Sequence, residues 1–133
     1  MKKIYIIILL AALLFLIIYG NIAFQSKPHS INYINLFLQI STNTSSVIQD
    51  NNLYFISPPR NTLSGSTILT NNEDEEKSIK ISSDGQLAEN GWLEIMEKSF
   101  SISPSQTKQI AIQISIPQNA KGNYTGRLII DSE

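Results

Sequence analysis

The strictest pattern in this sequence is an alternation of aliphatic and smaller or polar residues near its C-terminal end. Isoleucine occupies every second position from Ile110 to Ile116, and alanine, glutamine and serine stand between. β-Branched residues at this spacing disfavour a helix and place one buried face on an extended strand. Pro117 then ends the strand, because proline has no amide N–H for a sheet ladder. This segment therefore requires a fold that buries one face of a β-sheet.

Similar short segments recur through most of the chain. Strands are predicted over residues 34–40, 53–57, 64–71, 77–82, 92–96, 100–102, 108–116 and 124–130. A Ser/Thr/Asn-rich loop is predicted over 41–52 and an acidic turn over 72–76. Roughly seven or eight short strands, with no helical periodicity beyond the N-terminal segment, indicate an all-β sandwich or barrel.

The N-terminal segment is apolar from Ile4 to Tyr19, and it reaches Phe24 with Asn21 as its one strongly polar residue. This extended run has the length of about 20 residues that a membrane-spanning helix needs. Lys2 and Lys3 precede it and favour a cytoplasmic N-terminus. An uncleaved anchor is the favoured interpretation. A cleaved secretory signal is the alternative, although Asn21 fits poorly before a cleavage site that follows Ala23.

The predicted organisation is therefore an anchor or signal over residues 1–24, a polar linker over 25–31 and one domain over 32–133. The chain has 133 residues, and the part after the apolar segment has the usual size of one domain. Without Lys2 and Lys3, the remainder carries 8 basic and 11 acidic residues, a net charge of −3. This charge gives no electrostatic reason to bind nucleic acid.

Catalytic chemistry has few candidate groups in this sequence. The chain has no cysteine, which excludes disulfides and cysteine-based zinc sites, and its only histidine, His29, lies in the predicted linker. A serine nucleophile needs a base within hydrogen-bond reach, and one linker histidine is expected to be solvated. Paired carboxylates among Glu89, Glu94 and Glu97 have no evident cleft in so small a domain. We therefore expect a protein that is not an enzyme and needs no cofactor.

The run Glu73, Asp74, Glu75 and Glu76 is the one cluster of acidic residues. Carboxylate oxygens are ligands for Ca²⁺, but this run lacks the alternating Asp-x-Asp spacing and the glycine of known calcium loops. The favoured interpretation is a solvated turn between two strands. We expect no metal site, and these four residues are the only candidates for one.

Several aromatic residues are candidates for contacts with a ligand or partner. Trp92 could stack on a sugar ring, or it could pack in the core as tryptophan commonly does in sandwich domains. Tyr33, Phe37 and Tyr54 lie opposite the aliphatic rows of their strands and could form an exposed aromatic patch. The favoured interpretation for these three is a helix or linker that packs on that sheet, or ordinary irregularity of a sandwich.

Two sites fit the N-glycosylation rule. Asn43 begins Asn-Thr-Ser in the predicted loop, and Asn123 begins Asn-Tyr-Thr in the last strand. The loop position is the better acceptor, because Asn123 belongs to a strand motif.

The segment from Trp92 to Ile130 resembles the end of a prokaryotic immunoglobulin-like domain, of the BACON type or the alpha-galactosidase-associated type. The shared features are Trp92-Leu93, a turn at residues 103–106, the alternating strand ended by Pro117, and a closing Gly-x-Tyr-x-Gly pattern over residues 122–130. This chain has Ser105-Gln106 where those families usually have a glycine in the turn. The resemblance implies an immunoglobulin-like β-sandwich outside the cytoplasm, and it does not imply one activity.

These inferences together predict a membrane-anchored, extracytoplasmic module at the cell surface, preceded by one transmembrane or signal helix over residues 4–24. Its expected work is protein–protein interaction or structural support. A carbohydrate- or envelope-binding domain is the alternative, as is an accessory subunit of a surface filament or stator complex. Secretion after signal cleavage is the alternative location.

Overall fold

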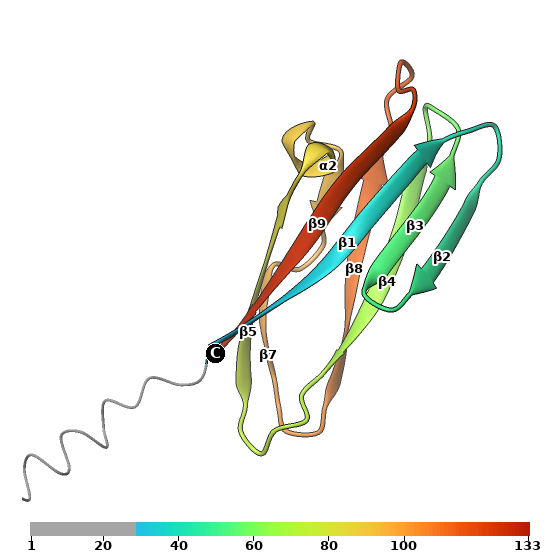
Figure 1. Cartoon of the computed structure of the whole chain (residues 1–133). Helices are drawn as coiled ribbons and strands as arrows, with labels where there is room; N and C mark the ends of the chain where they lie inside the picture. The colour runs from blue at the N-terminus through green and yellow to red at the C-terminus, as the bar shows by residue number, and fades with distance from the viewer. Residues whose placement is uncertain (1–28) are drawn as a thin grey trace, which may run out of the picture.

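The computed structural model describes residues 29–133, and these residues form two β-sheets in a sandwich-like arrangement (Figure 1). The larger sheet has six strands, in the spatial order β2 (Ser45–Gln49), β3 (Asn52–Ser57), β1 (Ser30–Ile40), β9 (Asn123–Ser132), β5 (Lys77–Asp84) and β7 (Ser99–Ile102). The smaller sheet has three, in the order β4 (Thr62–Thr70), β8 (Thr107–Ser115) and β6 (Leu93–Ile95). The predicted all-β sandwich is thus present.

Alternation of aliphatic residues explains how the two sheets meet. The isoleucines of β8 at positions 110, 112 and 114 are buried, while Ala111 and Gln113 face away from the core. β1 buries Ile34, Leu36 and Leu38 in the same way. Since successive side chains of a strand point to opposite faces, each sheet turns one apolar face inward. The core is therefore the layer between the sheets.

The pairing of β1 places the first described strand at the centre of the larger sheet. β1 is antiparallel to β9, with partners from Ser30↔Ser132 to Gln39↔Asn123. On its other side β1 is parallel to β3, with partners from Asn35↔Asn52 to Ile40↔Ser57. Parallel neighbours need a connection that crosses back along the sheet, and here the connection contains β2, which pairs with β3.

The strand count and two segments differ from the sequence-based prediction. Residues 29–133 contain nine strands instead of seven or eight, and the additional one is β2, which lies inside the predicted loop 41–52. All five residues of β2 are exposed, so no burial pattern marked it. β1 begins at Ser30, inside the predicted linker 25–31, because Ser30 and Ile31 pair with the end of β9.

A single helical turn, α2 (Gln86–Glu89), was also not predicted. It follows Gly85, whose φ of 82° is favourable only for glycine. Leu87 of this turn is fully buried and packs on Gly126 of β9, where an added Cβ would come within 3.1 Å of the Leu87 Cβ. One buried side chain gives no helical periodicity, so the sequence carried no signal for α2.

Several predictions concern residues that the structure does not describe. The anchor or signal over residues 1–24 and most of the linker lie outside residues 29–133. Within the described part of the chain, no helix has the length and apolar character that a membrane crossing requires.

Replacing a core leucine tests the packing between the sheets. Leu36 is fully buried, so Leu36→Ala is expected to lower the free energy of unfolding by about 2–5 kcal/mol through lost burial and a residual cavity. Ile68 is 71% exposed on β4, so Ile68→Ala should change it by less than about 0.5 kcal/mol. Urea denaturation followed by circular dichroism measures both. Equal losses for the two variants would contradict this assignment of the core.

Candidate interaction surface

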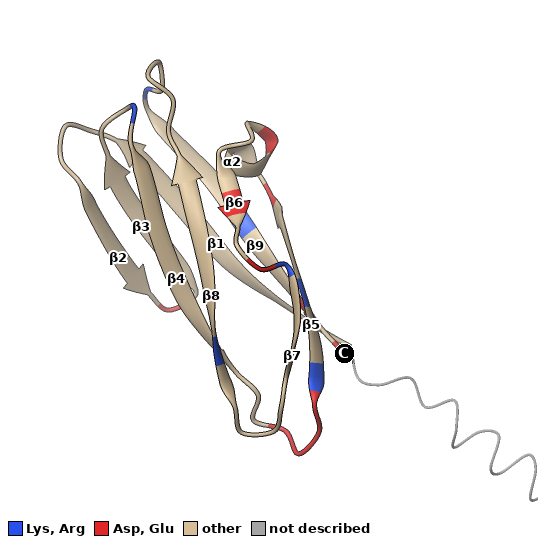
Figure 2. Cartoon of the chain, turned by 180° about the vertical axis from the view of Figure 1, so that it is seen from behind, with Lys and Arg blue, Asp and Glu red and all other residues tan. Residues whose placement is uncertain are grey.

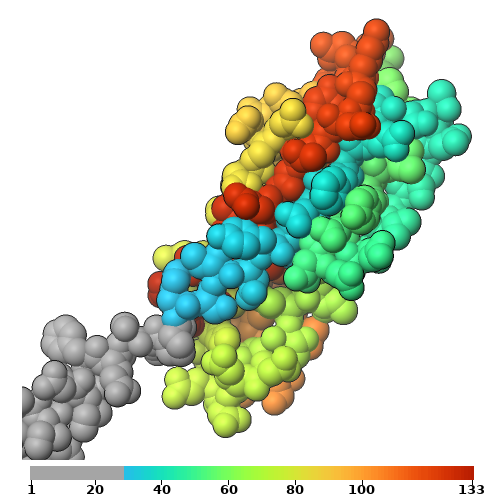
Figure 3. Space-filling view, in the orientation of Figure 1, coloured from blue at the N-terminus to red at the C-terminus, as the bar shows by residue number. Residues whose placement is uncertain are grey.

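The outer face of the larger sheet carries the predicted aromatic residues. Tyr33 and Phe37 of β1 and Tyr54 of β3 are all exposed and all point away from the core. Phe37 and Tyr54 are register partners, and their rings stack with centroids 4.9 Å apart and planes 12° apart. The exposure of these three side chains agrees with the patch interpretation, which was not the favoured one. Figure 3 views the molecule from the side of β1 and β9.

Further uncharged residues extend this surface across the sheet. Val47 pairs with Tyr54 from the neighbouring β2 and is exposed. A hollow of about 280 Å³ lies beside the stacked rings, and its lining includes Gln39, Asn123 and Thr125. We call Tyr33, Phe37, Val47 and Tyr54 the aromatic face. Apolar groups flanked by amides and hydroxyls are the usual composition of a partner-binding surface.

The first four strands, which include those of the aromatic face, carry no charged residues. No Lys, Arg, Asp or Glu occurs in β1, β2, β3 or β4. The charged residues of the described chain lie mostly on β5, β6, β9, the start of β8 and the connecting loops (Figure 2). A partner that contacts the aromatic face therefore meets few charges that must lose water.

One ion pair borders the aromatic face. Arg127 of β9 donates from Nε to Oδ1 of Asp84 at 3.1 Å and from its terminal nitrogen to Oδ2. The guanidinium also lies over the ring of Tyr33, 4.8 Å from its centroid. The hydrogen bond from Arg127 lowers the pKa of Asp84 below its ordinary value, and the positive charge adds to this effect.

Trp92 lies at the edge of the core. It is half-buried and packs against Tyr124, with ring centroids 4.5 Å apart and planes 58° apart. Its backbone N–H donates to the Leu87 carbonyl, and its carbonyl accepts from Ser115. Both interpretations of Trp92 therefore persist, with packing the better supported, since Tyr124 covers part of the indole.

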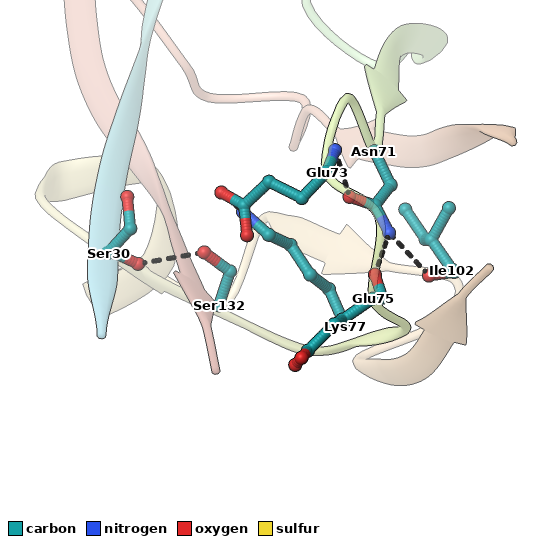
Figure 4. A network of polar contacts seen from close by, with 7 residues as sticks. All are labelled: Ser30, Asn71, Glu73, Glu75, Lys77, Ile102 and Ser132. Atoms are coloured by element: carbon teal, nitrogen blue, oxygen red, sulfur yellow. Dashed lines mark hydrogen bonds and ion pairs between the residues drawn. The ribbon is translucent and has the colours of Figure 1, made fainter. Parts of the chain in front are cut away.

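The acidic turn is organised by one buried side chain, Asn71 (Figure 4). Its Nδ2 donates to the carbonyls of Glu75 and Ile102 at 2.7 and 2.9 Å, and its Oδ1 accepts from the Glu73 N–H at 3.0 Å. This role of Asn71 could not be recognised from the sequence, because an asparagine beside a polar turn looks solvated. These bonds use both amide hydrogens and the amide oxygen of Asn71, and they tie the turn to β7.

The four acidic residues themselves do not converge. Glu73 pairs with Lys77 at 2.6 Å, and residues 73–76 are all exposed. Across residues 29–133, no three His, Asp or Glu side chains are placed to hold a metal ion. The solvated-turn interpretation agrees with this arrangement.

His29 is held by the end of β9. Its Nδ1 lies 3.1 Å from Asp131 Oδ1 and 3.8 Å from Glu133 Oε1. The Asp131 oxygen in this contact is buried. The His29 side chain is half-exposed. Its contacts with β9 were not expected for a residue of a solvated linker.

The remaining candidates lie on the surface. Asn43 is exposed in the turn between β1 and β2, and Asn123 is exposed at the start of β9. The carboxylates of Glu89, Glu94 and Glu97 are exposed, and Glu97 pairs with Lys108 at 2.8 Å.

Searches of protein-family models, curated proteins and solved structures found no match to this chain.

The pairing of Asp84 with Arg127 predicts a pH effect. Arg127→Gln should raise the pKa of Asp84 toward its ordinary value of 3.8. Because the folded-state pKa is lowered, the stabilisation is present above the ordinary value and is lost as the pH falls through the lowered one. Titration of the Asp84 carboxyl carbon by NMR measures the shift. Lys108→Gln is the control, and an unchanged Asp84 titration in Arg127→Gln would contradict the pairing.

Proposed function

We propose that this chain is a membrane-anchored, extracytoplasmic immunoglobulin-like module that binds a protein partner or supports a protein assembly at the cell surface. The observation that carries the proposal is the aromatic face. Aromatic residues stand exposed on the larger sheet, within a half of the domain whose strands carry no charge. Exposed apolar groups gathered on one face are typical of interaction sites.

The proposed location rests on the order of the sequence features. Lys2 and Lys3 precede the apolar run 4–24, which favours a cytoplasmic N-terminus and an exported domain. β1 begins at Ser30, so only a short polar segment separates the run from the sandwich. A domain attached so closely would present its sheets beside the membrane, which suits an accessory subunit of a surface filament or stator complex.

Three details support the immunoglobulin-like assignment. Trp92 and Tyr124, the two aromatic residues of the resemblance, are in contact. Ser105, which replaces the glycine common in those families, has a φ of 60°. This left-handed conformation favours glycine, so the turn is the kind that those families build. Pro117 follows the end of β8, as the resemblance requires.

The carbohydrate-binding alternative has less support. A sugar platform needs open aromatic ring faces, because pyranose rings stack on them. Phe37 and Tyr54 each cover one face of the other, and Tyr124 covers part of Trp92. These contacts favour a protein partner for the aromatic face.

Removing an aromatic side chain tests the proposed contact. Tyr54→Asp places a charge on the aromatic face and is expected to abolish copurification of a stoichiometric partner with the full-length chain from its native membranes. Met96→Asp is the matched control, since Met96 is exposed on the other side of the domain, next to β6. A partner retained equally by both variants would contradict the aromatic face, and a chain without any stoichiometric partner would contradict the function.

Fractionation tests the proposed location. We expect the full-length chain to remain in the membrane pellet after alkaline carbonate extraction and to keep its N-terminus at residue 1, because 4–24 is long enough to span a bilayer. Protease added to intact cells, where it reaches only the outer surface, should cleave the domain. A soluble product whose N-terminal sequence begins near residue 24 would establish the cleaved signal instead.

A further inference from the structure

The sandwich lacks a strand on one side. Phe55 of β3 lies over Gly65 of β4, since a Cβ added to Gly65 would come within 2.8 Å of the Phe55 ring. β3 is therefore opposite β4, which is the edge of the smaller sheet. β2 is the next strand of the larger sheet and extends beyond that edge in both views (Figures 1 and 2). Within residues 29–133, no strand lies opposite β2.

Ile48 shows the consequence for side chains. It pairs with Leu53 across β2 and β3, so both side chains point to the inner face of the sheet. Leu53 is 3% exposed, whereas Ile48 is 63% exposed. A large aliphatic side chain thus points inward and remains uncovered, because the smaller sheet ends one strand too early.

Among the described strands, none pairs with the backbone of β4 on the same side. The Ile116 N–H donates to the Asn61 carbonyl, and the Asn71 N–H donates to the Gln106 carbonyl. Hydrogen-bonded pairs alternate along an antiparallel ladder, so the odd-numbered residues between Asn61 and Asn71 bond to β8. The even-numbered residues direct their N–H and C=O groups to the free edge; these are Thr62, Ser64, Ser66, Ile68 and Thr70.

A hollow of about 400 Å³ joins these two features. It lies between β2 and the β4 edge, and its lining includes Ile48, Phe55, Gly65 and Ser66. None of its lining residues is charged. The occupant that such a hollow favours is uncharged, apolar on one side and able to form main-chain hydrogen bonds on its edge.

We propose that the β4 edge accepts one extended strand from a partner protein, uncharged and with aliphatic side chains at alternate positions. The strand would become the fourth of the smaller sheet, with its aliphatic side chains against Ile48 and Phe55 and its backbone bonded to the even-numbered residues of β4. This inference rests on the proposed function and goes beyond it, because it adds a second contact site at the β4 edge, separate from the aromatic face, and names the kind of segment that fills it.

A second copy of this chain fits the site poorly. If two β4 edges paired about a two-fold axis, each β2 would extend past its own edge into the space above the other copy. Each β2 would then overlap β3 of the other copy, because β3 already lies opposite the β4 edge there. The hollow instead accommodates a single strand with nothing attached on its outer side, as an extended segment provides.

A synthetic peptide tests the site directly. The probe is a fluorescein-labelled peptide with the sequence of residues 109–116, which is uncharged and places isoleucine at alternate positions. Fluorescence anisotropy measures its binding to the full-length chain in detergent micelles. We expect Ile48→Asp to weaken binding at least about tenfold, since a buried aliphatic contact becomes a buried charge. Ile68→Asp should bind within about twofold of the wild type.

Ile68 is the matched control, because it is 71% exposed on the outer face of the same β4 edge. Both substitutions are at exposed positions, and circular dichroism verifies that both variants fold. Equal binding by all three proteins, or no binding by the wild type, would overturn the proposal. A concentration-dependent dimer that Ile48→Asp abolishes, without peptide binding, would assign the site to a second copy and overturn the proposed occupant. If the peptide does not bind while Tyr54→Asp still abolishes copurification of a partner, the proposed interaction function is supported and the proposed strand site is contradicted.

Discussion

The antiparallel pairing of β1 with β9 is the contact on which the rest of the sandwich depends. It joins residues about a hundred positions apart, from Ser30↔Ser132 to Gln39↔Asn123. β3 attaches to the other side of β1 and β5 to the other side of β9, so each half of the larger sheet is held by one of these two strands. Leu36 and Leu128 face inward from this pair and are fully buried. This pair of strands therefore contributes both to the hydrogen bonding of the larger sheet and to the core.

The sheet edges on the two sides of the domain differ in the charge that surrounds them. Natural proteins commonly protect sheet edges with charged residues, which discourage pairing with other chains. The side of the domain that contains β7 has the Glu97–Lys108 and Glu73–Lys77 pairs nearby. On the opposite side, β2 and β4 carry no charge at all. The unprotected edges and the aromatic face thus belong to the same neutral half, which is where contacts with another chain cost the least desolvation.

The sequence predicted the strands whose alternation reflects burial, and it missed features that depend on tertiary contacts. β8, β5 and most of β1 and β9 were recognisable because their aliphatic residues recur at period two. β2 was not, because its residues are exposed and its stability comes from pairing with β3. The parallel pairing of β1 with β3 left no trace in composition, since register across a sheet is decided by non-local contacts.

The candidate site was predictable to a similar degree. The aromatic residues of β1 and β3 were identified from the faces of their strands, and their stacking required the register between those strands. The open edge of β4 could not be inferred, because it depends on how strands divide between the sheets. His29 was expected to be solvated and Asn71 was not singled out, yet each is held by groups that are distant in sequence or in a neighbouring turn.

The central position of β9 has a consequence for synthesis on the ribosome. β1 is made first among the described strands, and its main partner is made last. Until then the nascent chain exposes one edge of β1, together with the inward row of Ile34, Leu36 and Leu38. Exposed aliphatic rows and open edges are prone to aggregation, so the unfinished polypeptide needs shielding by a chaperone or rapid handling until its final strand emerges. The larger sheet can therefore close only after β9 has been made.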